Sequence, residues 1–114
     1  MRYLLLVFLL LACNNSTEPK PDPSISGTWR WTFLSVPQFD VVLTQNNTTF
    51  SGSGVYYTAG SAACTINGNF NYPNTSWVLT YSATTMIGSG TMTHPDTISF
   101  KWSNSDIQHQ LTRH

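Results

Sequence analysis

Residues 26–33, Ser-Gly-Thr-Trp-Arg-Trp-Thr-Phe, indicate the fold class, because polar and apolar side chains alternate along them. Successive side chains of a β-strand point to opposite faces, so Trp29, Trp31 and Phe33 share one face. A helix would instead place its apolar residues three or four positions apart. The stretch therefore predicts a half-buried β-strand that contributes two tryptophans to a core.

The alternation continues to the C-terminus in runs rich in Thr, Val, Ile, Tyr, Phe and Trp, at a spacing of 8 to 12 residues. In the last run, parity places Ile107, His109 and Leu111 on the apolar face. No helical period of any length occurs after residue 25. The expected strands are about 26–34, 38–45, 48–57, 63–71, 75–82, 85–93, 96–102 and 106–113.

The links between these runs are short and contain turn-forming residues, such as Asn46 and Asn47 or the pairs Pro73-Asn74 and Pro95-Asp96. Eight strands joined only by hairpin-length links form an antiparallel up-and-down meander, and closure into a barrel removes its exposed edges. A two-sheet sandwich usually needs longer crossovers. The sequence thus predicts an all-β, eight-stranded barrel over residues 26–114.

Glycines recur inside three predicted strands, in Phe50-Ser-Gly-Ser-Gly54, Thr65-Ile-Asn-Gly-Asn69 and Ile87-Gly-Ser-Gly90. Glycine weakens a strand unless a tight bend or a close approach requires it, and small coiled barrels have both needs. Because these strands carry little core volume, we expect the Trp-rich strands to fill the lumen opposite them.

The segment Ser26-Gly27-Thr28-Trp29 resembles the Gly-x-Trp signature of calycin barrels, the lipocalins and avidin-like proteins. The resemblance implies an eight-stranded meander in which Trp29 closes the base. In lipocalins an arginine near the final strand stacks on this tryptophan, and Arg113 is the candidate here. The polar ring with which avidins hold biotin has no assignable equivalent, so biotin binding is not implied.

The N-terminus predicts export. Arg2 precedes an apolar run of ten residues, 3–12, which as a helix reaches only about 15 Å, half of a membrane's hydrocarbon core. This is the format of a cleaved signal peptide over residues 1–12. Leu10-Leu-Ala-Cys13 resembles the lipobox of bacterial lipoproteins, which implies lipid acylation of Cys13. Since Asn14 is not the Asp that commonly retains such proteins at the inner membrane, the resemblance implies an outer-membrane anchor in the bacterial cell envelope.

Residues 13–25 read as a tether, because Pro19, Pro21 and Pro23 favour extended polyproline geometry. The domain after them contains one cysteine, Cys64, which cannot form an intramolecular disulfide and is expected to be a small buried residue.

Composition and site chemistry argue against several functions. Five Lys and Arg balance five Asp and Glu in the 114 residues, so no basic patch for nucleic acid is expected. No serine lies in a nucleophile elbow, and no Cys or His spacing resembles a zinc site. The sequence therefore predicts no enzyme, metal or cofactor. The aspartates and histidines of the domain, the candidates for acid-base chemistry, are Asp40, Asp96, Asp106, His94, His109 and His114.

The aromatic residues are the candidate site, and two hypotheses stay open. Tryptophan walls beside glycine-lined strands suit a small apolar ligand or a short peptide in the barrel mouth. The residues expected to bind it are Trp29, Trp31, Trp77, Trp102 and Tyr56. Alternatively, the tryptophans fill the lumen, and the protein is an inhibitor or adaptor of another envelope protein. That hypothesis places function in the loops around 56–61 and 72–76.

Overall fold

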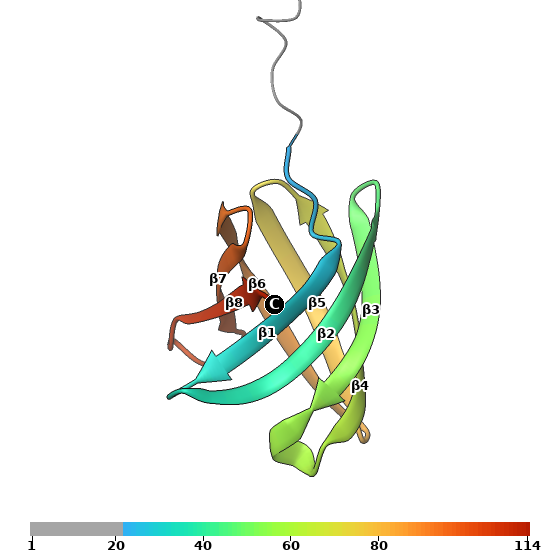
Figure 1. Ribbon diagram of the computed structural model, residues 1–114, viewed down its shortest axis with the longest axis vertical. Coiled ribbons are helices and arrows are strands. Elements are labelled where there is room, and N and C mark those ends of the chain that lie inside the picture. The colour runs from blue at the N-terminus through green and yellow to red at the C-terminus, as the bar shows by residue number, and fades with distance from the viewer. Residues whose placement is uncertain (1–21) are drawn as a thin grey trace, which may run out of the picture.

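The computed structural model describes residues 22–114, which form one closed antiparallel β-barrel (Figure 1). A single 3-10 turn, η1 (Tyr57–Ala59), follows β3. The predicted fold class is confirmed. The strands are β1 (Gly27–Phe33), β2 (Val36–Asn46), β3 (Thr49–Tyr56), β4 (Ala62–Asn71), β5 (Asn74–Tyr81), β6 (Thr84–His94), β7 (Thr97–Trp102) and β8 (His109–Arg113).

Each strand pairs with the next along the chain, and β8 returns to pair with β1, where Trp31 lies opposite Leu111. One predicted boundary is wrong. The last strand begins at His109 rather than at 106, and Ile107 is 52% exposed instead of facing the core. Residues 103–108 connect β7 to β8 as a loop, in which the Ser105 hydroxyl accepts a hydrogen bond from the Ile107 amide. The alternating pattern of residues 106–113 does not indicate how many residues are needed to connect β7 to β8.

Because the strands alternate in direction, the barrel has two distinct ends (Figure 1). We call one the tether end: here the chain enters at residues 22–26, beside the turns that follow β2, β4 and β6. We call the other the mouth end: it carries the β1–β2 and β5–β6 turns, η1 and the 103–108 loop. Any segment that anchors the chain through its N-terminus therefore meets the barrel opposite the mouth end.

The core is the lumen, and apart from Ile107 the residues that parity placed on the inner face of the first and last runs face it. The buried residues include Trp29 and Trp31 of β1, Phe39 of β2 and Cys64 of β4. Their immediate neighbours in each strand, which point to the outer face, are more exposed. Burial raises the pKa of the Cys64 thiol, as expected for a packing residue. The remaining buried apolar side chains include Val41, Leu43, Ile66, Leu79, Ile98, Phe100 and Leu111.

The tether end is closed by Ile25 and Trp29 together with Arg113, which comes from the other end of the domain. The Trp29 indole N–H donates to the Ile25 carbonyl oxygen at 2.8 Å, and Ile25 is fully buried. The Arg113 guanidinium lies 4.4 Å from the centre of the Trp29 ring, which is the contact expected of this arginine. Gly27 makes this possible, because its φ is +132° and a Cβ there would lie 2.6 Å from an Arg113 nitrogen.

Arg113 also ties the ends of the domain together. Its guanidinium donates hydrogen bonds to the carbonyl oxygens of Ser24, Ser26 and Pro95 at 2.6–3.2 Å. Ser24 and Ile25, which the sequence analysis assigned to the tether, are thereby packed on the barrel.

We expect Arg113→Ala to lower the free energy of unfolding by about 2–4 kcal/mol, since charge-assisted hydrogen bonds and a cation–π contact are lost together. Arg113→Lys keeps the charge but not the planar fork, so it should recover less than half of that loss. Urea unfolding followed by tryptophan fluorescence measures both, and a fully stable lysine variant would contradict this account.

The predicted signal peptide 1–12, the acylation site Cys13 and the tether residues up to Pro21 lie outside the described residues. Within residues 22–114 there is no helix of the length and hydropathy needed to cross a membrane.

Candidate functional site

Three of the predicted site residues meet inside the lumen. The ring centre of Trp31 lies 5.3 Å from that of Trp102, and Trp102 lies 6.2 Å from Trp77. Phe100 fills the space between them, 5.0 Å from Trp77 and 5.9 Å from Trp31. These are the separations of packed aromatic pairs. Since β1 and β5 lie across the barrel from each other, the rings form a continuous chain from one wall to the other.

Two glycines on the barrel wall make room for aromatic rings of the neighbouring strand. A Cβ on Gly88 would lie 2.6–2.8 Å from the Trp77 indole, and one on Gly68 would lie 2.6 Å from the Phe50 ring. In both places the ring occupies the volume that a neighbouring side chain would need. Trp31, Trp77 and Trp102 are each no more than 5% exposed. The middle of the lumen is therefore filled by aromatic side chains.

The other two predicted residues lie apart from this cluster. Trp29 belongs to the closed tether end and is 0% exposed beneath Arg113. Tyr56 lies at the end of β3 near the mouth, where it stacks on Tyr81 with ring centres 4.4 Å apart. Its ring centre is also 6.4 Å from that of Trp31, so Tyr56 connects the filled lumen to the barrel mouth.

Sequence reasoning missed four residues that line the mouth. Phe33, Tyr81 and Met86 are half-buried and pack against the core, and His109 sits beside them. The ring of His109 lies 4.9 Å from that of Trp31 and 5.2 Å from that of Phe33. We call these four residues, together with Tyr56, the mouth layer. Parity had placed Phe33 and His109 on the inner face, but which end of the barrel each would reach depends on the register.

His109 is 8% exposed, and this burial lowers the pKa of its imidazole. A lowered pKa means that the unfolded chain binds the proton more strongly than the native protein does. Stability is then fully present above the ordinary histidine pKa of about 6.5 and declines as the pH falls below it.

We expect the free energy of unfolding to decrease between pH 7.5 and pH 5, above the range in which carboxylates titrate. His109→Gln should flatten this decrease, whereas Gln110→Ala, at an exposed position of the same strand, should leave it unchanged. Urea unfolding at a series of pH values measures the slope. An equal slope in wild type and His109→Gln would exclude His109 as its source.

Several large apolar side chains at the mouth end point into solvent. Leu34 is 81% exposed, and Val36, Tyr57 and Ile107 are 52%, 38% and 52% exposed. We call these four residues the mouth rim. Leu34 and Ser35 form the β1–β2 turn with φ values of +53° and +67°. Turns of this kind favour Asn-Gly, and a side chain at positive φ costs roughly 1–2 kcal/mol.

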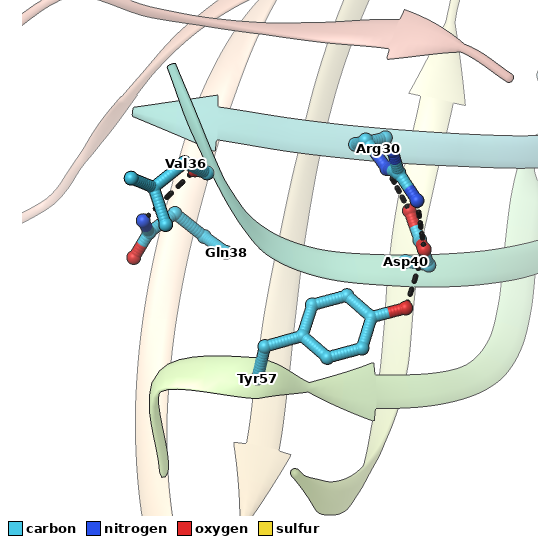
Figure 2. Close-up of polar contacts among 5 residues, drawn as sticks. All are labelled: Arg30, Val36, Gln38, Asp40 and Tyr57. Atoms are coloured by element: carbon cyan, nitrogen blue, oxygen red, sulfur yellow. Dashed lines mark hydrogen bonds and ion pairs between the residues drawn. The ribbon is translucent and has the colours of Figure 1, made fainter. Parts of the chain in front are cut away.

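A polar network on the outer wall holds η1 beside the mouth (Figure 2). Arg30 makes a two-pronged ion pair with Asp40, at 2.7 and 2.8 Å, and the Tyr57 hydroxyl donates to the same carboxylate at 2.6 Å. The hydrogen bonds from Arg30, and then from Tyr57, lower the pKa of Asp40, while its partial burial opposes them. The Asp40 carboxylate therefore positions Tyr57.

The indole N–H groups of the buried tryptophans differ in whether they have a hydrogen-bond partner. The indole N–H groups of Trp31, Trp77 and Trp102 are buried and have no hydrogen-bond partner within residues 22–114, unlike that of Trp29. A buried donor without an acceptor costs about 1–3 kcal/mol. Across the same part of the chain, no three His, Cys, Asp or Glu side chains come together in a group that could hold a metal ion.

Together these features define a small closed β-barrel with a filled aromatic lumen, an arginine-capped base and an apolar rim at its mouth. No protein-family model, curated protein or solved structure matches the chain.

Proposed function

We propose that this protein is a lipid-anchored lipoprotein of the bacterial cell envelope whose barrel is a solid-core interaction module, an inhibitor or adaptor of another envelope protein. The observation that supports this function best is the filled lumen. The ring chain from Trp31 through Trp102 and Phe100 to Trp77 leaves the loops and the outer surface as the parts available for contact.

The mouth rim supports the same function. An 81% exposed Leu34 in a positive-φ turn adds no core burial and strains the backbone, so folding does not explain it. Ile107 lies at the same end of the barrel, and the Asp40 network holds Tyr57 there. Apolar side chains presented on fixed turns are suited to a protein partner. The chain enters at the opposite end, which leaves the rim free when the N-terminus is anchored.

Site-specific photocrosslinking in the producing bacterium tests the proposed interaction. A benzophenone amino acid replaces Leu34 or Ile107 at the mouth rim and, as matched controls, Val42 or Ile87, which are 55% and 49% exposed on the barrel wall. We expect one discrete crosslinked product from the rim positions and none from the wall. Rim positions that give no product, or the same products as the wall, would contradict the interaction.

The anchor has its own test. Labelled palmitate should enter the wild-type protein, and Cys13→Ser should lose both the label and its place in the outer-membrane fraction. Label that persists in Cys13→Ser would contradict the lipobox interpretation. The interaction and the anchor can fail separately.

A second candidate function is binding of a small apolar ligand at the mouth. It is favoured by the three buried indole N–H groups without an acceptor and by the half-buried aromatic residues of the mouth layer. A ligand carrying a hydrogen-bond acceptor that reached Trp31 or Trp102 would satisfy one of these donors. Titration of the protein with lipids, haem and aromatic metabolites, followed by tryptophan fluorescence, tests this function. An unchanged spectrum across the panel would count against it.

A further inference from the structure

The tether end carries a polar cleft that neither proposed function uses. It has a volume of about 230 Å³ and lies between the entering chain at residues 22–24 and the turns after β2 and β4. Pockets for drug-sized ligands usually measure about 300–1,000 Å³. The cleft is therefore suited to one ring-sized unit. Its polar and aromatic lining includes Asp22, Gln45, Asn47, Phe70, Asn71 and Tyr72.

Hydrogen bonds fix one wall of this cleft. The Gln45 side-chain oxygen accepts from the Ile25 amide at 2.8 Å and from the Ser24 hydroxyl at 3.1 Å. Its side-chain nitrogen donates to the Asn47 carbonyl oxygen at 2.8 Å. These bonds join the entering chain to the β2–β3 turn. The cleft is thus preorganised, which reduces the entropy that binding would cost.

The rest of the lining offers an aromatic ring and side-chain amides. Tyr72 is 42% exposed, and its ring packs against that of Phe70 in an edge-to-face arrangement with ring centres 6.2 Å apart, so the tyrosine ring has a fixed support. Within residues 22–114, the side-chain amides of Asn47 and Asn71 make no hydrogen bond. Each amide offers two donors and an acceptor oxygen to a ligand.

This chemistry favours a neutral polyol ring. The residues that line the cleft in the described part of the chain include no Lys, Arg or His, so a phosphate or sulfate would find no countercharge. Amide and carboxylate groups match the paired hydroxyls of a sugar, which both donate and accept. The apolar C–H face of a sugar ring can pack on the exposed Tyr72 ring. Hydroxyl pairs beside an apolar ring face are the defining features of a pyranose.

A second depression of about 200 Å³ adjoins the first and shares Asn71 with it. It is lined by Asn69, Asn71, Asn74, Thr75 and Ser76, which offer amides and hydroxyls but no carboxylate or aromatic ring. Two neighbouring depressions of similar size fit two consecutive ring units. We propose that the tether-end cleft and this depression together bind a neutral oligosaccharide of at least two sugar units, with Asn71 between them and Tyr72 as the stacking platform.

The experiment is titration of the full-length, ¹⁵N-labelled protein in detergent with cellobiose, chitobiose and maltotriose, followed by NMR. We expect at least one of these sugars to shift the backbone amides of residues 45–48, 69–72 and 74–76, and a disaccharide to bind at least tenfold more tightly than the matching monosaccharide. Because this mapping uses the wild-type protein, it does not depend on how well any variant folds.

Variants then test the assigned residues. Asn71→Ala and Tyr72→Ala should each weaken binding at least tenfold, while Tyr72→Phe keeps the ring and should stay within threefold. Asn104→Ala, at an exposed asparagine of the mouth-end loop, is the matched control and should bind normally. The proposal is overturned if none of the three sugars binds, if the shifted amides lie at the mouth end, or if adenosine binds there in their place. Photocrosslinking at the mouth rim is unaffected by any of these outcomes.

Discussion

Trp77→Ala is expected to lower the free energy of unfolding by about 3–5 kcal/mol and to regain part of it when indole is added. The Trp77 ring is 2% exposed, lies over Gly88 and contacts Phe100 at a centre-to-centre distance of 5.0 Å. Removal of the ring leaves a cavity of indole size with apolar walls. The hydrogen-bonded strands of the barrel keep this cavity from collapsing. A ligand that binds only the native state then raises the melting temperature by mass action.

Thermal unfolding with and without indole measures both effects. Val78→Ala is the matched control, because Val78 follows Trp77 in the same strand but lies on the outer face and is 40% exposed. This substitution should lower the free energy of unfolding by well under about 1 kcal/mol. The wild-type protein should show no stabilisation by indole, since its lumen is filled. If indole stabilised the wild type as strongly as Trp77→Ala, the lumen would already hold a ligand-sized space, and the ligand-binding function would replace the interaction module.

Gly54→Ala is expected to cost about 3 kcal/mol although it adds a single methyl group. A Cβ at this position would overlap the Asp40 carbonyl oxygen and lie 2.8 Å from the Val41 Cα. Both atoms belong to the backbone of the neighbouring strand β2, where Gly54 pairs with Val41. A flexible side chain could move aside, but a paired strand moves only if its ladder of hydrogen bonds is disturbed.

Ser53→Ala provides the comparison, because Ser53 is the adjacent residue of β3 and points into solvent. Urea unfolding should give a stability close to wild type for Ser53→Ala and a large loss for Gly54→Ala. A Gly54→Ala variant as stable as the wild type would show that β2 and β3 can separate without penalty. The close approach of the two strands would then not explain the glycines of the third strand.

The pattern of residues predicted the sheet and its faces well. Alternation around Trp29 and Trp31 placed both inside, and the glycines of β3 and β6 were assigned to close approaches that the structure contains. This succeeded because the side-chain period of a strand is a local property that neighbouring residues determine. The start of the last strand was wrong for the same reason. Ile107 keeps the local pattern, but pairing with β7 begins only at His109, and the chain reaches that residue through the 103–108 loop.

The candidate site was predictable in its composition but not in its arrangement. The five aromatic residues named from the sequence are all buried, yet Trp29 closes the base, Tyr56 lies at the mouth, and only Trp31, Trp77 and Trp102 form the central cluster. Residues 29 and 31 point to the same face, and nothing local tells which is deeper. The depth of each ring depends on strand tilt and register, which only closure of the barrel defines.

By itself, the sequence determined that this chain forms eight antiparallel strands with one apolar face, because strand propensity, alternation and short turns act between near neighbours. The tertiary structure decided the rest. It brought Arg113 over Trp29 from the far end of the chain, joined rings from opposite walls across the lumen, and left Leu34 and Ile107 exposed at one end. These contacts join residues far apart in sequence, and their distances follow from how the closed sheet curves, a property that no single segment carries.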